Sequence, residues 1–273
     1  MSQHSNGPIE AVEPSKAQLR SVRRLHQRKF RQQEREFLVE GPNAVREALN
    51  HDDPGLVHAV FVDPESPEAF DIIDMAQRRG APVQATTGRA LAEMCDTVTP
   101  QGVLAVCGHL DVEPDDIPAD AKLILVCARV RDPGNAGAII RCADAFGADA
   151  VVISADSVDV YNPKVVRASV GSMFHLPLVL GVQLDMIIGD LQDRGFQVFA
   201  AEGSGEPVSQ LASDGTLARP TAWVMGNEAW GLTPEDSVLC DRSVAVPIHG
   251  RAESLNLATA AAVLMYATAT AQY

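Results

Sequence analysis

Apolar and polar positions follow two patterns along this chain. Short apolar runs are typical of strands buried in a sheet, and longer segments with apolar residues at helical spacing are typical of covering helices. Before residue 110, strands are predicted at 37–41, 57–62, 83–85 and 103–107, with helices at 17–36, 42–49, 67–79 and 89–95. This order predicts a small α/β unit of about ninety residues, within the usual size of a domain.

The same alternation continues after residue 120. Strands are predicted at 123–127, 150–153, 176–180, 197–201, 222–225 and 244–246, and helices at 136–146, 163–170, 184–194 and the C-terminus. Strands that alternate with helices indicate a parallel sheet in a three-layer α/β arrangement. Ligands of such sheets bind beyond the carboxyl ends of the strands. This rule selects the loops at 129–135, 202–206, 226–231 and 249–256.

Composition divides the chain into four segments. Residues 1–15 are polar, contain Gly and Pro, and are expected to form a disordered tail. Residues 16–110 form the first expected domain, and residues 121–273 form the second. Between them, residues 111–120 are acidic with two prolines and are expected to be the linker.

The C-terminal segment combines a strand, a loop and a helix. The strand at 244–246 stops at Pro247, a polar loop follows at 249–253, and Ser254-Leu255-Asn256 opens a helix of almost entirely apolar residues. A helix that is apolar all round is expected to be buried. Its uncharged run is shorter than the ~20 residues that span a bilayer, and the N-terminus lacks the apolar stretch of a signal peptide, so no membrane partner is expected.

Charge is distributed unevenly along the chain. The formal net charge is −14, yet residues 16–35 hold eight basic residues and one acid. A basic arm on an acidic body favours a polyanionic partner. The alternative is that these charges form the solvated face of an amphipathic helix.

Cysteine usage points to a reducing compartment. The five cysteines are widely scattered and contain no Cys-x-x-Cys pair, which is typical of core residues in a cytoplasmic protein rather than of a disulfide framework or zinc site. No other metal-ligand spacing is present, so no metal is expected. Nor does a Ser/His/Asp arrangement or a pair of carboxylates stand out.

Two of the selected loops have turn chemistry without a phosphate-binding fingerprint. Asp132-Pro133-Gly134 is a tight turn, and Asn135 is the expected N-cap of the next helix. Residues 226–231 lack the Lys-Ser/Thr of a phosphate-cradling loop, and Gly203-Ser204-Gly205 is followed by Glu206-Pro207, which disfavours the helix start that pyrophosphate needs. A ligand held by backbone groups at these turns fits better than a nucleotide phosphate.

Arg141 follows on the helix after the first of these turns. Its neighbours Ile139, Ile140 and Ala143 are expected to be buried, so the arginine requires a partner or a function. An ordinary salt bridge is the simplest interpretation.

Three motifs occur in a fixed order after the expected strands. They are Asn135-x5-Arg141 with Gly147, then Met225-Gly226-Asn227-Glu228-x2-Gly231, then Val246-Pro247-Ile248-x5-Ser254-Leu255-Asn256-Leu257. Together they resemble the motifs of the SpoU/TrmH family of RNA ribose 2′-O-methyltransferases, in the SPOUT superfamily. The basic helix, residues 37–41 and residues 99–103 are similar to the ribosomal-protein-L30-like substrate-binding domain that is common in this family.

The resemblance implies a fold and a cofactor. The expected fold is an α/β methyltransferase domain with a C-terminal trefoil knot, preceded by the small L30-like α/β domain. Family members are homodimers that bind S-adenosylmethionine (AdoMet) in the knot, near the interface. The residues that match the AdoMet-binding positions, largely through backbone atoms, are Gly203, Gly226, Val246, Ile248 and Leu255.

The resemblance also implies catalytic residues. The family's catalytic arginine matches Arg141, with Asn135, Glu228, Ser254 and Asn256 as its companions. Because a guanidinium has a pKa above ~12 and is rarely deprotonated in proteins, we expect it to stabilise a developing alkoxide or clamp a phosphate rather than act as a base. Glu228 and Asn135 would orient it.

The basic arm then acquires a partner. RNA phosphates are its expected ligand, and the expected RNA-binding residues are Arg23, Arg24, Arg28, Lys29 and Arg31. The N-terminal domain favours ribosomal RNA, of the 23S type, over tRNA. A tRNA 2′-O-methyltransferase and a catalytically silent RNA-binding member are the alternatives. A nucleotide-dependent oxidoreductase is disfavoured because the dinucleotide fingerprint is missing.

Overall fold

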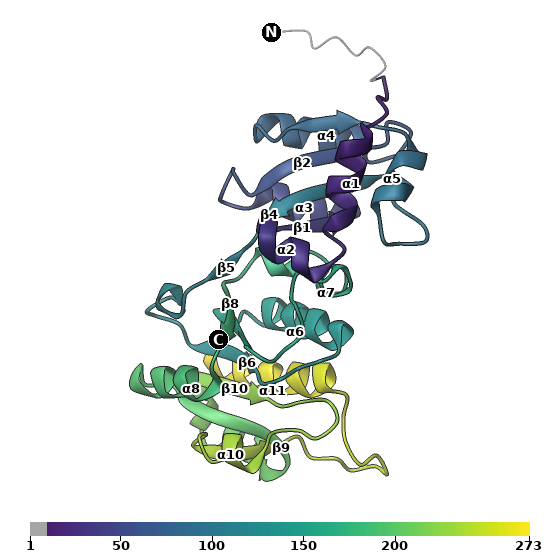
Figure 1. Ribbon diagram of the computed structural model, residues 1–273. Coiled ribbons are helices and arrows are strands. Elements are labelled where there is room, and N and C mark those ends of the chain that lie inside the picture. The colour runs from purple at the N-terminus through teal and green to yellow at the C-terminus, as the bar shows by residue number, and fades with distance from the viewer. Residues whose placement is uncertain (1–9) are drawn as a thin grey trace. The chain divides into compact units, whose positions relative to one another are not determined.

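The computed structural model describes residues 10–273 and divides into two units (Figure 1). Unit 1 comprises the described residues up to His109 together with Tyr161–Arg167, and unit 2 comprises Leu110–Val160 and Ala168–Tyr273. Most of the expected tail lies outside the described residues. Within its last part, Val12 donates its N–H to the Ala85 carbonyl at 2.9 Å and Ser15 caps the first helix, so this part is structured.

Unit 1 is built on a mixed four-stranded sheet in the order β1-β4-β2-β3. β4 is antiparallel to both β1 and β2, and β3 is parallel to β2. The strands are β1 (Glu36–Glu40), β2 (Val57–Val62), β3 (Val83–Ala85) and β4 (Val103–Gly108), and the helices are α1 (Lys16–Arg24), α2 (Arg28–Glu34), α3 (Pro42–Asn50), α4 (Ala69–Arg78) and α5 (Gly88–Met94). The predicted strands of the first domain are all present.

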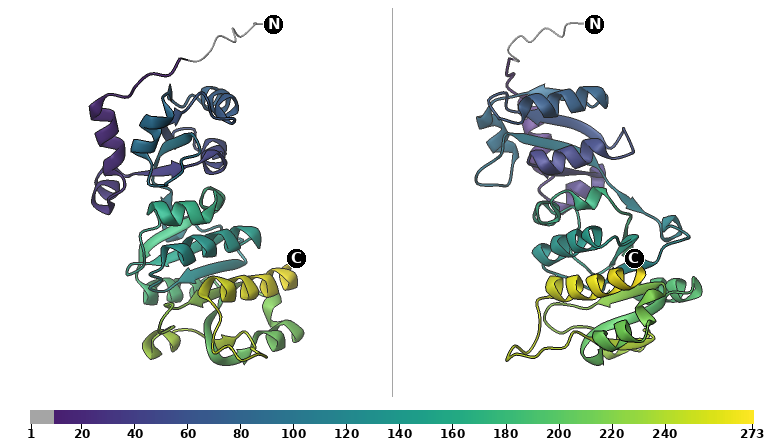
Figure 2. Two further views of the ribbon diagram at one scale, coloured as in Figure 1. Left: turned by 90° about the vertical axis from the view of Figure 1, so that its right-hand side faces the viewer. Right: turned by 180° about the vertical axis from the view of Figure 1, so that it is seen from behind.

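Helices cover both faces of this sheet. In the left view of Figure 2, α1 and α2 lie on one side of the strands and α3 and α4 on the other. On the α1 side, Leu25 from the end of α1 and Leu91 from α5 pack with Leu38 and Leu104 of the sheet. Burial of these apolar side chains supplies most of the driving force that holds α1 in place.

The single basic helix predicted at 17–36 is wrong, because the chain breaks at Leu25–Gln27. Leu25 is only 3% exposed, and Gln27 adopts an extended conformation before α2 begins. His26 lies with Nε2 at 2.7 Å from the Met94 carbonyl oxygen. The break lets Leu25 enter the core, which a continuous exposed helix would not allow.

Unit 2 is built on a seven-stranded sheet within the described residues, in the order β11-β9-β10-β6-β7-β8-β5. Every pairing in it is parallel, which confirms the predicted arrangement. The strands are β5 (Asp111–Val112), β6 (Leu123–Cys127), β7 (Ala150–Ser154), β8 (Leu178–Val182), β9 (Gln197–Pro207), β10 (Thr221–Met225) and β11 (Arg242–Ala245). All residues of β6, β7 and β10 are buried, as expected for strands covered on both faces.

Helices cover both faces of the second sheet as well. On one face, α8 packs Ile187 and Leu191 against Ile124 and Val126 of β6. On the other, α11 lies alongside α6, as both views in Figure 2 show, and buried Trp223 of β10 donates its indole N–H to Thr268 at 2.9 Å. The helices of unit 2 are α6 (Pro133–Ala145), α8 (Leu184–Asp193), α9 (Val208–Ser213), α10 (Pro234–Ser237) and α11 (Leu257–Gln272), with short 3₁₀ turns η1 (Pro114–Asp116), η2 (Ser172–Phe174) and η3 (Thr216–Ala218); α7 (Pro163–Ser169) begins in unit 1.

The segment 111–120, predicted as a linker, is part of unit 2 instead. β5 pairs in parallel with β8, and Ile117 is buried in the core of unit 2. The prolines and acidic residues that suggested a linker occupy the exposed turn at η1. A short edge strand with few apolar residues carries too weak a pattern to be recognised.

The C-terminal helix is less buried than its composition predicts. Ala261, Leu264, Met265 and Thr268 are buried against the rest of unit 2, whereas Tyr266 is 61% exposed. α11 packs against α6, α9 and η3. The resemblance implies that the C-terminal segment forms a trefoil knot, and the knot stays a prediction. Among residues 10–273, no helix is long and apolar enough to cross a membrane.

Candidate active site

The candidate site forms where four neighbouring parallel strands end. β11, β9, β10 and β6 are adjacent in the sheet, so the residues that follow their carboxyl ends share one edge. The predicted loop at 202–206 is partly wrong, because β9 continues to Pro207 and pairs again with β11 beyond an irregularity in the register. Gly203 is therefore exposed on this extended strand. Glu202 beside it accepts hydrogen bonds from Ser237, at 2.8 Å, and from Ser243.

Glu228 is the anchor of the site. It follows β10 in a tight turn closed by Asn227 and Gly231, whose backbone groups exchange two hydrogen bonds of 2.8 Å. Its Oε2 accepts the N–H of Arg131 at 3.1 Å, and its Oε1 accepts the N–H of Asp132 at 2.9 Å. The carboxylate therefore joins the turn after β10 to the first turn of α6, where a negative charge also interacts favourably with the helix dipole.

A chain of side-chain hydrogen bonds extends from Glu228 to the start of α11. Asn135 donates Nδ2 to Glu228 Oε1 at 3.4 Å, and Asn256 donates Nδ2 to Asn135 Oδ1 at 2.9 Å. Asn256 Oδ1 accepts the N–H groups of Ala258 at 2.9 Å and Thr259 at 3.3 Å as the N-cap of α11. These backbone donors fix the orientation of Asn256, which in turn fixes the donor and acceptor of every bond down to Glu228.

Asn135 has a different local role from the one predicted. α6 begins at Pro133, and Asp132 caps it by accepting the N–H of Asn135 at 2.8 Å. Asn135 is therefore inside the helix rather than its N-cap. This position frees its amide to connect Glu228 with Asn256. The sequence contained the competing signal, because Asp is as good a cap as Asn and Pro favours the first helical position.

Arg141 and Ser254 are not part of this chain of hydrogen bonds. Arg141 is exposed on α6, and among the described residues it makes no hydrogen bond or ion pair, so the predicted salt bridge is absent there. Ser254 is exposed in the loop before α11. The inference that Arg141 needs a partner because its neighbours are buried is wrong, since a helix turns by about 100° per residue and flanking positions face elsewhere.

The loop after β11 presents groups that a ligand could use. Val246 is half-buried, Ile248 is 39% exposed and Leu255 is 36% exposed, and the backbone N–H groups of residues 248–255 make no hydrogen bond with other described residues. Gly226 is buried at the end of β10, and a Cβ there would collide with the backbone of Gly231 and Leu232. Free backbone donors beside apolar side chains fit a ligand that presents both an apolar face and hydrogen-bonding edges.

The cysteine nearest to the site is held in its neutral form. Cys127 is buried at the end of β6, and this burial, with a smaller contribution from the Glu228 carboxylate, raises the pKa of its thiol to about 12. Nucleophilic chemistry needs the thiolate. Cys127 is therefore a core residue, and the polar chemistry of the edge is carried by Glu228 and the two asparagines.

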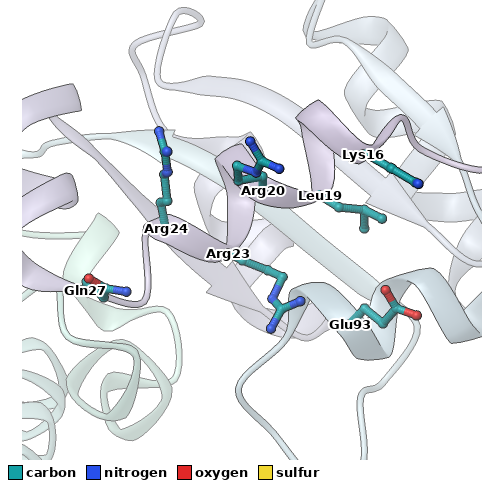
Figure 3. A pocket seen from close by; sticks show the side chains of 7 residues that line it. All are labelled: Lys16, Leu19, Arg20, Arg23, Arg24, Gln27 and Glu93. Carbon is teal, nitrogen blue, oxygen red and sulfur yellow. The ribbon is translucent and has the colours of Figure 1, made fainter.

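Unit 1 carries a separate basic groove. Its cavity of about 390 Å³ is lined by Lys16, Leu19, Arg20, Arg23, Arg24, Gln27 and Glu93, with the basic side chains coming from α1 and Glu93 from α5 (Figure 3). Arg23 and Arg24 belong to the predicted RNA-binding set, and exposed Arg28 and Lys29 lie on α2. Lys16 and Arg20 were not in that set. Lys16 precedes Arg20 by four residues, and Arg20 precedes Arg23 and Arg24 by three and four. This spacing places all four side chains on the same face of the helix.

The predicted RNA contact at Arg31 is wrong. Arg31 is only 2% exposed, and its Nη1 donates to the Leu25 carbonyl oxygen at 2.8 Å. The guanidinium satisfies a carbonyl at the break between α1 and α2, so it stabilises the bend. Nothing in a run of basic residues distinguishes the one that turns inward.

Comparisons with known proteins find matches over most of the chain. Residues 122–266 match the SpoU rRNA Methylase family, and residues 16–105 match the MRM3-like substrate binding domain. The 23S rRNA (guanosine(2553)-2'-O)-methyltransferase RlmP of Bacillus subtilis (strain 168) is 34% identical over 260 residues, which cover 94% of this chain and 98% of that protein.

Two solved structures carry the same fold. The AdoMet-bound rRNA methyltransferase from Sinorhizobium meliloti is 27% identical with a TM-score of 0.79, covering 96% of this chain and 98% of its own. The SpoU methyltransferase AviRb from Streptomyces viridochromogenes, in complex with AdoMet, is 29% identical with a TM-score of 0.80, covering 93% of this chain and 98% of its own.

Proposed function

Because the chain belongs to the SpoU rRNA methylase family, we propose that it transfers a methyl group from AdoMet to a ribose 2′-hydroxyl of 23S-type ribosomal RNA. The observation that carries this proposal is the hydrogen-bonded chain from Glu228 through Asn135 to Asn256, at the edge where parallel strands place their ligands. It ties together three motifs that lie far apart in sequence. The test is transfer of a labelled methyl group from AdoMet to a ribosomal RNA transcript, with tRNA as the comparison substrate.

AdoMet supplies an electrophilic methyl group when bound. The chain's own residues have to hold the cofactor and align the ribose. The cofactor would be held through backbone groups of Val246, Ile248 and Leu255, and of Gly203 and Gly226. The unpaired N–H groups of residues 248–255 support this placement. Ser254, two residues before the fixed Asn256, would then face the ribose.

Arg141 provides the charge for this reaction. A guanidinium remains protonated in proteins, so its role is to stabilise the alkoxide that develops at the 2′-oxygen or to clamp an adjacent phosphate. Its exposure and lack of a partner among the described residues leave its donors available. The proton of the hydroxyl would pass to solvent or to an RNA phosphate, since Glu228 is already engaged by two backbone N–H groups.

The basic groove on α1 is the proposed phosphate anchor for RNA. Replacing Arg20, Arg23 and Arg24 by glutamine in one triple variant is expected to weaken RNA binding. Because each phosphate contact in single-stranded RNA contributes about 0.7 to the slope of log affinity against log salt, the slope should fall by about 2. Filter binding across a series of salt concentrations measures both quantities.

Two controls accompany the groove variant. Arg78→Gln removes one charge from α4, on the opposite face of the unit 1 sheet, and should leave RNA binding unchanged, whereas Arg23→Gln should lower the slope by a fraction of the triple effect. The AdoMet affinity should be the same in all variants. An unaltered salt slope in the triple variant would contradict the anchor and favour a merely solvated helix face.

A homodimer is supported by an unpartnered face of unit 2. Thr259, Val263, Tyr266 and Thr270 recur at helical spacing on the exposed side of α11, next to α6, and the Phe146 and Tyr266 rings lie 5.9 Å apart between the two helices. The exposed side chains of Val263 and Tyr266 in this stripe favour a protein contact. We infer that a second copy of the chain covers this face, which would also bring Arg141 close to the interface.

Val263→Glu is expected to convert the dimer to a monomer and to abolish most of the methyl transfer, because a buried unpaired carboxylate is costly at an apolar contact. Light scattering after size-exclusion chromatography measures the mass. Val238→Glu, at a position 79% exposed after α10, is the matched control and should stay dimeric and active. A wild-type protein that is monomeric while fully active would refute the inference.

A further inference from the structure

Arg129 has an unusual conformation directly beside the candidate site. Its φ is +55°, in the left-handed region, and within the described part of the chain only Arg35 and Val170 share this feature among residues other than glycine. Left-handed backbone is unfavourable for a side chain with a Cβ. Such strain persists only where surrounding contacts impose it, and it concentrates at functional sites.

The contacts of Arg129 extend to three other elements. Its N–H donates to Ser154 Oγ at the end of β7, at 2.9 Å, and its carbonyl oxygen accepts Asn227 Nδ2, at 2.8 Å. Its guanidinium forms an ion pair with Asp236, whose side chain is 12% exposed. The left-handed turn is what directs the backbone to Asn227 and the side chain to α10 at the same time.

Asp236 is itself built into the start of α10. Its Oδ2 accepts Thr233 Oγ1 at 2.7 Å and the Thr233 N–H at 3.3 Å, which completes a capping box. Arg129 therefore holds both ends of the segment 227–236, which contains Glu228. Two residues beyond Arg129, the N–H groups of Arg131 and Asp132 bind the Glu228 carboxylate.

We propose that Arg129 is a positioning residue, which through its ion pair with Asp236 holds the loop 129–132 against the turn that carries Glu228. This proposal rests on the proposed function for its kinetic consequences. Arg129 acts through Glu228 and Asn135 and need not touch the RNA or the cofactor. Without the ion pair, the two loops keep their backbone contacts but lose the side-chain connection that sets their distance.

The first test replaces the guanidinium by an uncharged chain of similar length, Arg129→Met. The single-turnover rate of methyl transfer should fall about 10- to 100-fold, as expected when reacting groups are displaced by a fraction of an ångström to one ångström. The AdoMet affinity and the KM for RNA should change little. Arg129→Lys should recover most of the rate, because it restores a charge that can reach Asp236.

Coupling to Asp236 is tested by a double-mutant cycle. Asp236→Asn should lower the rate to a similar extent, and Arg129→Met/Asp236→Asn should be no slower than either single variant. Arg219→Met is the control, because it removes the same side chain from an exposed position of unit 2 that takes no part in the site, and it should keep the wild-type rate. Rate losses that multiply in the double variant would overturn the role of the ion pair.

A readout that does not depend on activity separates this proposal from the proposed function. Hydrogen exchange of the Arg131 and Asp132 amides should be faster in Arg129→Met than in the wild type, whereas the amides of β6 should not change. If the wild-type protein fails to methylate ribosomal RNA, the exchange experiment still decides the positioning role. Unchanged exchange at both amides, with a wild-type rate where activity exists, would overturn it.

Discussion

Replacing Arg141 by alanine is expected to lower the rate of methyl transfer by about 10²- to 10³-fold, the range observed when a single preorganised donor to a developing oxyanion is removed. The AdoMet affinity and the thermal stability should stay at the wild-type values. Arg141 is exposed and has no partner among residues 10–273, so the fold does not depend on its side chain. Single-turnover kinetics with a ribosomal RNA transcript, with the melting temperature measured in parallel, checks both statements.

Arg141→Lys separates the two roles that a guanidinium can have. A bidentate clamp on phosphate uses the planar fork of donors, which lysine lacks, so the lysine variant should retain only a small part of the rate. A lysine variant with nearly full activity would eliminate the clamp and leave a point charge near the 2′-oxygen. Arg219→Ala removes another exposed arginine from unit 2 and should behave as the wild type.

The architecture was predictable because the local pattern of apolar residues along the chain indicates which segments are buried. β6 and residues 222–225 of β10 form continuous apolar runs, which indicate a parallel sheet covered on both faces before any contact is known. Strands that are parallel and adjacent place their carboxyl ends together. The edge that holds Glu228 and Asn256 therefore followed from topology, and β5 was missed because two residues carry no pattern.

The orientation of individual side chains was not predictable in the same way. Arg31 lies in a run of basic residues and Arg141 lies among apolar ones, yet Arg31 is 2% exposed and bonded to a carbonyl, whereas Arg141 is exposed. Whether such an arginine is buried or exposed depends on where its helix ends and on which face of the helix packs against the sheet. The uniformly apolar α11 shows the same limit, since composition gives no direction and Tyr266 remains 61% exposed.

Glu228→Gln is expected to lower the rate by about 10²-fold while the protein stays folded. The carboxylate accepts two backbone N–H groups and the Asn135 amide, whereas a glutamine at this position has one oxygen and would direct its NH₂ group at a donor. One partner is then left without its hydrogen bond, and because these groups are exposed or half-buried, the loss of stability should stay at or below about 1 kcal/mol. Kinetics and thermal unfolding measure the two effects, and Glu235→Gln, exposed on α10, is the control.

Because each hydrogen bond in the chain has a defined donor and acceptor, a double variant that exchanges them can restore the connection. Such a variant shows whether Glu228 and Asn135 act by orienting Asn256 or by contacting the reacting groups. Asn135→Asp alone places a second carboxylate against Glu228 and should be as slow as Glu228→Gln. In the double variant Asn135→Asp/Glu228→Gln, the new glutamine can donate to the new aspartate, which still accepts from Asn256 Nδ2, so the connection to α11 is restored. We therefore expect the double variant to be faster than either single variant. If all three are equally slow, Glu228 or Asn135 contacts the reacting groups directly, and alignment of Asn256 is not its main contribution.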